Sequence, residues 1–343
     1  MAHKIVLFNH KGGVSKTTSA FNIGWTLANN NHKTLLVDCD PQCNLTALFL
    51  GNSFDQYYTD DSTKNQNIRD GVKMVFDGHP TPIQPIHCPT ASRNKNLYLL
   101  PGHMNLSEYD AQLNFAQTAT IALSSLKSLP GAFNDLIEKT AAQYQIEYII
   151  IDLNPGLSSI NQNLFLISDA FLIPTNPDMF SLMAIKSLSA ILPKWVIWKT
   201  QNIDNFKDSA YPLPSGTPKF IGTIAQRFNI RNGKATSPYK TKIIDLTNLV
   251  KSTLIPALEK AGMLFSTEQY KNAEIPDSFC LEEIKDYQGL APKSQEYNVP
   301  VFMLTDKELN ASGAALEGMK ENREHFKNIY KSIANKISSL FVK

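Results

Sequence analysis

"FNHKGGVSKTT", residues 8–18, follows an apolar run and precedes a segment with helical spacing. It resembles the pattern G-x-x-x-x-G-K-[ST] of a phosphate-binding loop, because Lys16 and Thr17 supply the final two letters. The two glycine positions of that pattern hold His10 and Ser15 instead. A second lysine and two glycines crowd the front of the stretch, so its role depends on its context and on the extra lysine.

The flanking residues predict a strand, a loop and a helix in that order. Residues 4–9 form a short apolar run, and residues 15–30 carry Ala20, Ile23 and Leu27 at helical spacing. A loop in this position directs backbone N–H groups and the positive end of the helix dipole toward one small volume. Such a volume favours a phosphate chain.

The residue types of the loop suit this role. Gly12 and Gly13 remove Cβ atoms where the backbone must approach a ligand. Lys16 would contact the β- and γ-phosphates, and the Thr17 hydroxyl would coordinate Mg²⁺. Ser15 is small enough to replace the second glycine if its position does not require a positive φ.

Aspartates end two later apolar runs. The run at 34–37 stops at Asp38 and Asp40, and Asp152 ends the apolar part of 147–156. Ligands of open α/β sheets bind beyond the carboxyl ends of the strands. An aspartate there can hold Mg²⁺ directly or through water, or orient a water for attack on a γ-phosphate. Together with the phosphate loop, the three acids predict a nucleotide-hydrolysing site.

Strand-like and helix-like segments alternate along the rest of the chain. Further strands are expected at 97–102, 170–177, 219–229 and 299–304. This alternation predicts an α/β fold with a doubly wound, mostly parallel sheet flanked by helices, the P-loop NTPase type. We expect a single ATPase domain over residues 1–343, with loop-rich inserts at about 51–95 and 199–218. A short helix is expected near 68–76 within the first insert.

Composition limits the class of protein. The 343 residues are 43% hydrophobic and 19% charged, with a net charge of +2. We see no apolar run near the roughly 18 residues that span a bilayer, and no secretory signal, so we expect a cytoplasmic protein. The four cysteines, Cys39, Cys43, Cys88 and Cys280, include no C-x-x-C pair, which suits a reducing compartment.

Four segments carry a specific resemblance. "KGGVSKTT" (11–18), "LLVDCDPQCN" (35–44), "YIIIDLNPG" (148–156) and "FLIPTNPDMFSL" (171–182) resemble, in order and spacing, the ParA/MinD family of deviant Walker A ATPases. The ParA-like partition branch is the most similar. The resemblance implies ATP and Mg²⁺ as cofactors, weak hydrolysis of ATP to ADP and phosphate, a homodimer with ATP, and a ParB-like or other adaptor that stimulates hydrolysis.

The resemblance also implies roles for single residues. Lys11 would be the signature lysine, which reaches the phosphates of the partner subunit, so the two lysines of the loop serve two nucleotides. Asp40 would position the attacking water, Asp152 would be the Walker B residue, and Asp38 would support the magnesium shell. The metal set is then Thr17, Asp38 and Asp152, and the catalytic set is Lys11, Lys16 and Asp40.

The implied nucleotide contacts extend beyond the loop. Asn154 and Pro155 would form the switch that senses the γ-phosphate, and Gln226 falls where relatives commonly carry an asparagine that reads adenine. The nucleotide-binding set is Lys11, Gly12, Gly13, Val14, Ser15, Lys16, Thr17, Thr18 and Gln226.

Positive charge gathers in two segments. Residues 227–242 carry five bases and no acid, and residues 320–343 carry six bases against two acids. Such segments can contact DNA phosphates without reading sequence, as ParA-like ATPases do when dimerised by ATP. The candidate DNA-binding residues are Arg227, Arg231, Lys234, Lys320, Arg323, Lys327 and Lys331. A solvated helix face and loop would show the same charges.

Other functions on the same fold stay open. The apolar face of residues 326–341 is typical of a MinD-like membrane helix. A terminal helix packed on the sheet has the same apolar face, and we favour this second interpretation. A ParA-like ATPase that regulates a protein complex without DNA is a further alternative. The spacing Cys39-x-x-x-Cys43 does not match an iron–sulfur carrier.

Overall fold

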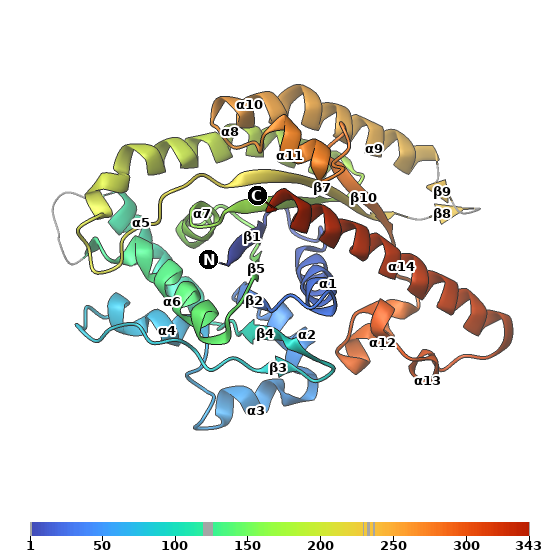
Figure 1. Cartoon of the computed structure of the whole chain (residues 1–343), viewed down its shortest axis with the longest axis horizontal. Helices are drawn as coiled ribbons and strands as arrows, with labels where there is room; N and C mark the ends of the chain where they lie inside the picture. The colour runs from blue at the N-terminus through green and yellow to red at the C-terminus, as the bar shows by residue number, and fades with distance from the viewer. Residues whose placement is uncertain (1, 119–125, 229, 232–233, 236, 343) are drawn as a thin grey trace.

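The computed structural model describes residues 2–118, 126–228, 230–231, 234–235 and 237–342, without the side chains of residues 227–238. Within these residues, eight strands form one sheet in the order β10-β7-β6-β1-β5-β2-β4-β3 (Figure 1). Its strands are β1 (His3–Leu7), β2 (Thr34–Cys39), β3 (Thr90–Ala91), β4 (Asn94–Leu100), β5 (Tyr148–Leu153), β6 (Ala170–Thr175), β7 (Lys219–Phe228) and β10 (Cys280–Lys285). All neighbours are parallel except β3 and β4. The doubly wound, mostly parallel α/β sheet predicted from the sequence is confirmed.

Helices cover both faces of this sheet. They are α1 (Lys16–Asn29), α2 (Asn44–Leu50), α3 (Phe54–Thr59), α4 (Ile68–Phe76), α5 (Asp110–Thr118), α6 (Leu129–Tyr144), α7 (Ser159–Leu166), α8 (Met179–Asn202), α9 (Ser237–Leu249), α10 (Ile255–Lys260), α11 (Thr267–Asn272), α12 (Leu290–Tyr297), α13 (Asp306–Leu309) and α14 (Gly313–Leu340). Shorter turns are η1 (Gly51–Ser53), η2 (Leu106–Tyr109), η4 (Ile203–Phe206), η5 (Val250–Leu254) and η6 (Val301–Met303), and a separate two-stranded pair is formed by β8 (Ile230–Arg231) and β9 (Lys234–Ala235).

The side chains of β1 alternate between two hydrophobic cores. Ile5 and Leu7 face the core under α1 and α14, whereas Val6 and Phe8 face the core under α4, α6, α7 and α8. All four side chains are buried. A strand that is apolar on both sides belongs in the middle of a sheet covered by helices, which is where β1 lies.

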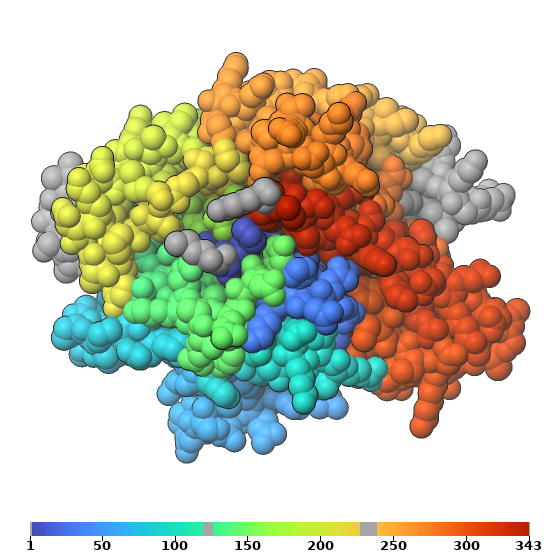
Figure 2. Space-filling model, viewed as in Figure 1, coloured from blue at the N-terminus to red at the C-terminus, as the bar shows by residue number. Residues whose placement is uncertain are grey.

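The carboxyl-terminal helix α14 is part of the core. Its apolar residues Phe326, Tyr330, Ile333 and Ile337 are buried in the same cluster as α1. In the space-filling view, α14 lies beside the amino-terminal part of the chain (Figure 2). The expectation that this helix packs on the sheet is confirmed, and its apolar face is not available to a membrane in this conformation.

The strand predicted at 299–304 was wrong. Pro300 has no backbone N–H to give to a sheet, and its carbonyl instead accepts a hydrogen bond of 2.8 Å from the N–H of Met303, which closes η6. The last strand of the sheet is β10, which we did not predict. Its two consecutive acids, Glu282 and Glu283, interrupt the apolar pattern on which the strand assignments relied.

The loop-rich insert expected at about 199–218 is helical in part and packed on the rest of the protein. Helix α8 continues to Asn202, and the buried Lys199 donates hydrogen bonds to the carbonyls of Leu166 (2.7 Å) and Gly216 (2.8 Å). Phe206 is also fully buried. The segment is therefore a strap packed on the body of the protein. In the first insert, the helix predicted near 68–76 is confirmed as α4.

Helix α8 contradicts the expectation that no segment could span a membrane. Residues 179–206 form one helical stretch that is long and apolar enough by length and composition. Its side chains Ile185, Leu188 and Leu192 are buried against the sheet, and a buried lysine lies near its end. One side of α8 therefore packs in the hydrophobic core.

The packing of the strap can be tested at Gly131 in α6. A Cβ atom at this position would clash with the backbone carbonyl oxygen of Tyr211 in the strap. We expect Gly131→Ala to lower the free energy of unfolding by about 1–3 kcal/mol, measured by urea denaturation. As a control, Gly318→Ala in α14 meets open space and should raise that free energy by about 0.5–1 kcal/mol. Equal stability of Gly131→Ala and wild type would contradict the close packing of the strap.

Candidate nucleotide-binding site

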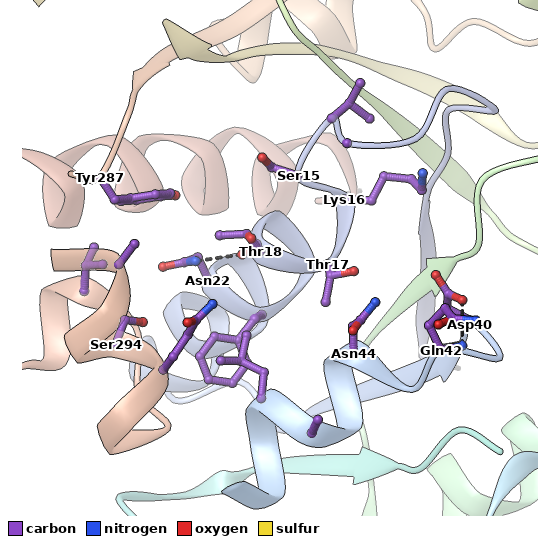
Figure 3. A pocket seen from close by; sticks show the side chains of 18 of the residues that line it. Ser15, Lys16, Thr17, Thr18, Asn22, Asp40, Gln42, Asn44, Tyr287 and Ser294 are labelled. Atoms are coloured by element: carbon purple, nitrogen blue, oxygen red, sulfur yellow. Dashed lines mark hydrogen bonds between the residues drawn. The ribbon is translucent and has the colours of Figure 1, made fainter. Parts of the chain in front are cut away.

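The predicted phosphate loop lies between β1 and the first turn of α1, at the carboxyl end of the parallel strands. It opens into a cavity of about 760 Å³ (Figure 3). Of the predicted site residues, those that line the cavity are Gly12, Gly13, Val14, Ser15, Lys16, Thr17, Thr18, Asp40 and Pro155. The cavity continues along α1 to α2, α12 and the end of β10.

Lys16 occupies the inner end of the loop. Its side chain is buried, and its ammonium donates hydrogen bonds to the backbone carbonyls of Asn9 (3.0 Å) and Lys11 (3.3 Å). Burial lowers the pKa of Lys16, while the charges of Asp152 and Asp40 oppose this shift. The ammonium is therefore held between the loop and the acids, where it can meet the β- and γ-phosphates of a nucleotide.

The backbone of the loop turns through the left-handed region twice. Gly13 has φ 72°, as its missing Cβ allows. We expected serine to fit the second glycine position only if that position did not require a positive φ. Ser15 has φ 59° and ψ 34°, so this condition is not met. A non-glycine residue in this region costs about 1–2 kcal/mol. Strain is therefore stored at the position where the loop becomes a helix.

Asp152 is a fully buried acid at the end of β5. The parallel register places it beside Leu7 of β1 and beside Asp38 of β2. It is fully buried, and neither carboxylate oxygen has a hydrogen-bond partner in the part of the chain that is described. Burial, and then the charge of Asp38, raises the pKa of Asp152, while the Thr17 hydroxyl and Lys16 oppose the rise.

These residues fit a magnesium ion bound together with a nucleotide. Mg²⁺ takes few protein ligands and completes its shell with water and phosphate oxygens. The Thr17 hydroxyl and the unpartnered oxygens of Asp152 lie where such an ion would bind. Among the described residues, no group of three or more His, Cys, Asp or Glu side chains could hold a metal unaided.

Asp38 fastens the turn that carries Asp40. Its Oδ2 accepts hydrogen bonds from the backbone N–H (2.8 Å) and hydroxyl (2.7 Å) of Thr46 in α2. Its Oδ1 accepts one of 3.2 Å from the N–H of Asp40. Burial raises the pKa of Asp38 to about 6, although the Thr46 bonds oppose this. Asp38 thus orients the β2–α2 turn, and Asp40 lies at the rim of the cavity near Lys16 (Figure 3).

The predicted switch residues form the turn after β5. The backbone carbonyls of Asn154 and Gly156 each accept a hydrogen bond of 3.1 Å from the buried side chain of Asn161 in α7. Pro155, between them, is exposed and lines the cavity opposite Gly12. Asn161 was not predicted. The turn is therefore fixed to α7 at its ends while its middle faces the ligand space.

Lys11 points away from the cavity and toward the start of α8. Its ammonium lies 2.5 Å from Asp178 Oδ2 and 3.1 Å from Ser181 Oγ, and it sits 5.9 Å from the centre of the Phe180 ring. Burial would raise the pKa of Asp178, but hydrogen bonds from Lys11 and from the N–H of Ser181 lower it. The sequence analysis missed Asp178, whose place before an apolar helix is a typical N-cap signal.

Gln226 does not reach the cavity. Its side chain is buried, and its Nε2 donates a hydrogen bond of 2.6 Å to the hydroxyl of Ser19 in α1. The adenine-reading position implied for Gln226 is therefore turned toward the core side of α1 in this structure.

The family of the chain follows from its sequence. A family model, the AAA domain AAA_31, matches residues 2–203. The chain belongs to this ParA/MinD-like family. The chromosome partitioning protein ParA of Myxococcus xanthus is 30% identical over 185 residues, which make up 54% of this chain and 56% of that protein. ParA of Caulobacter vibrioides is 28% identical over 185 residues, with 54% and 60% covered.

Solved structures of similar fold include proteins with bound nucleotide. Cyanothece McdA in complex with ATP has a TM-score of 0.56 at 17% identity, covering 94% of this chain and 96% of that one. A plasmid partition protein of Borrelia burgdorferi bound to AMPPNP has a TM-score of 0.53 at 18% identity, covering 95% and 100%. These likenesses show the ParA-like fold. The matches with curated relatives span 52% to 62% of those proteins' own lengths.

The basic residues proposed for DNA contact are mostly paired where the structure describes them. Lys320 and Arg323 lie within 4 Å of Asp306, and Lys327 lies 3.4 Å from Glu324. Lys331 is exposed and forms no ion pair with a described residue. The side chains of Arg227, Arg231 and Lys234 fall outside the described part of this ParA-like chain.

The strain at Ser15 predicts the outcome of substitution. Ser15→Gly relieves the left-handed backbone, so the free energy of unfolding should equal or exceed that of wild type, with ATP binding retained. Ser15→Val places a β-branched side chain at positive φ and should lower stability by at least about 1 kcal/mol. Gln145, at the end of α6 and outside the cavity, also has a positive φ of 57°. Gln145→Gly is therefore the control for the effect of glycine at such a position on stability alone. A stable Ser15→Val protein would contradict the observed loop conformation.

Proposed function

We propose that this chain is an ATP-dependent dimerising switch of the ParA type. In this proposal the chain binds Mg²⁺-ATP and forms a homodimer in the ATP state. Slow hydrolysis of ATP, which an adaptor protein stimulates, ends that state. The observation that carries the proposal is the divergence of the two loop lysines. The side chain of Lys16 lies at the inner end of the cavity, whereas the side chain of Lys11 points away from the cavity toward Asp178.

The cavity supplies what phosphoryl transfer to water requires. Lys16 and the amino end of α1 offer positive charge to the phosphates, and Asp40 at the rim accepts a proton or a hydrogen bond from an attacking water. Thr17 and Asp152 would hold Mg²⁺, which would supply positive charge to offset that of the phosphates. Pro155 and its fixed turn would report the presence of the γ-phosphate. An arrangement of this kind supports ATP hydrolysis as the activity of the site.

The rim around Lys11 supports a second copy of the chain as the partner. The Phe180 ring lies 5.9 Å from the Lys11 ammonium, and Met179, Phe180 and Met183 at the start of α8 are each at least 60% exposed. Leu157, in the turn after β5, is 47% exposed. Apolar side chains gathered in this way mark interaction surfaces. In a dimer they would be covered, and Lys11 would leave Asp178 for the phosphates of the partner's nucleotide.

DNA is the surface on which we propose that the ATP dimer acts. The support is the similarity to proteins named ParA, the five bases of residues 227–242, and the exposed Lys331, which has no ion-pair partner among the described residues. The ion pairs on α14 weaken the contribution of Lys320, Arg323 and Lys327. A ParA-like ATPase that acts on a protein complex without DNA is the alternative, and a membrane is disfavoured because the apolar face of α14 is buried.

The roles assigned to Lys16, Lys11 and Asp178 predict three different effects on nucleotide binding and assembly. Lys16→Ala should abolish ATP binding, whereas Lys11→Ala should bind ATP as a monomer and lose the dimer. Asp178→Asn weakens the contact that holds Lys11 within its own subunit, so it should strengthen ATP-dependent dimerisation by a few-fold. Sedimentation with ATP, ADP and Mg²⁺, alongside a direct binding measurement, checks each outcome. Normal ATP dimerisation of Lys11→Ala would contradict the assignment in trans.

DNA binding should require the dimer. The Asp40→Ala protein, expected to stay in the ATP state, should bind a random-sequence duplex more tightly than the monomer. Its affinity should also fall more steeply with salt, because each phosphate contact contributes about 0.9 to the slope. Lys331→Glu and Arg231→Glu should reduce that slope, and Lys64→Glu, outside both basic segments, should not. A verified dimer that binds no DNA at low salt would contradict this surface altogether.

A further inference from the structure

The cavity continues well beyond the phosphate loop. Asn22 lines it six residues after Lys16, which is about 9 Å along α1. At this end the walls include the aromatic ring of Tyr287 and the apolar side chains of Phe21 and Val301. Polar side chains, among them Gln295 and Asn298, also line this end, and the Tyr287 ring offers a flat apolar surface that suits the base of a triphosphate held at the loop.

Asn22 presents an unpaired acceptor to this space. Its side chain is only 3% exposed, and its Nδ2 donates a hydrogen bond of 2.6 Å to the carbonyl of Thr18 one turn earlier. This bond fixes which end of the amide faces the ligand. Its Oδ1 has no partner among the described residues and points toward the side of Tyr287 and Ser294 (Figure 3). A buried acceptor left unpaired is costly, so the site is built to receive a donor.

The wall opposite Asn22 is held rigidly. The hydroxyls of Tyr287 and Tyr330 share a short hydrogen bond, and the Tyr287 ring lies 4.5 Å from the ring of Phe326. The hydroxyl of Ser294 is committed to the carbonyl of Val299 at 2.6 Å. A ligand in this space therefore meets an aromatic ring fixed by its packing and one acceptor, Asn22 Oδ1, that has no donor among the described residues.

We propose that Asn22 Oδ1 accepts a hydrogen bond from the exocyclic amine of adenine, and that Asn22 determines the base specificity of the nucleotide site. This inference rests on the proposed ATP-binding function. It assigns base recognition to α1 rather than to Gln226, whose amide is engaged with Ser19. Guanine and hypoxanthine carry a carbonyl in place of the amine and would set two acceptors against each other.

A nucleotide that lacks only this amine tests the contact. Calorimetric titration of the full chain with Mg²⁺ should show ATP binding about tenfold more tightly than purine riboside triphosphate, as expected for one hydrogen bond. Asn22→Leu, of similar size but without an acceptor, should bind the two within about twofold of each other. Asn22→Asp retains an acceptor oxygen and should keep the preference for ATP, even if its negative charge weakens the binding of both nucleotides.

Inorganic triphosphate separates this inference from the proposed function. Each variant should bind it as wild type does, which shows that the fold and the phosphate loop are intact. A preference for ATP that survives in Asn22→Leu would overturn the role of Asn22 alone. If wild type prefers ATP over 2′-deoxy-ATP and Asn22→Leu loses that preference, Asn22 contacts the sugar. This result would also overturn the proposed role of Asn22 in base recognition. A wild-type chain that binds neither ATP nor triphosphate would overturn both proposals.

Discussion

The parallel register of β1, β5 and β2 is the constraint on which the site depends. Leu7, Asp152 and Asp38 are neighbours across these three strands, so the phosphate loop and the acids emerge at one edge of the sheet. A slip of one residue would turn Asp152 toward the other face. The two hydrophobic cores prevent such a slip, because the alternating side chains of β1 are committed to opposite faces. Packing far from the cavity therefore sets the geometry of its charges.

Charge at this edge is only partly compensated within the chain. Burial raises the pKa of Asp38 to about 6 and raises that of Asp152 as well, so each carboxylate is costly to ionise in the folded state. Groups of this kind stabilise the folded state at low pH, and that stabilisation is lost as the pH rises through their pKa values in the folded state. Lys16 offsets part of the cost, and Lys11 does not, because Asp178 holds it at the rim. A divalent cation bound with the phosphates would complete the compensation.

The sequence predicted the parts of the site that are local in the chain. The phosphate loop, and Asp38 and Asp152 at strand ends, could be located because an apolar run, a turn and a charge adjoin one another in sequence. The contact of Lys11 with Asp178 joins residues 167 positions apart, so only the folded chain could show it. The direction of Gln226 depends on how β7 faces α1, which strand periodicity does not determine. The last strand was missed because adjacent acids hide its buried positions.

Helix α14 connects the interior of the protein to its exterior. Tyr287, a wall of the cavity, is joined through its hydroxyl to Tyr330, which is fully buried within this helix. Lys327 and Lys331 lie next to that anchor and face solvent. Helix α14 is about 40 Å long, so the same element that supports this wall of the cavity also carries basic side chains on the outside of the protein. One helix thus forms part of the interior packing and part of the charged surface.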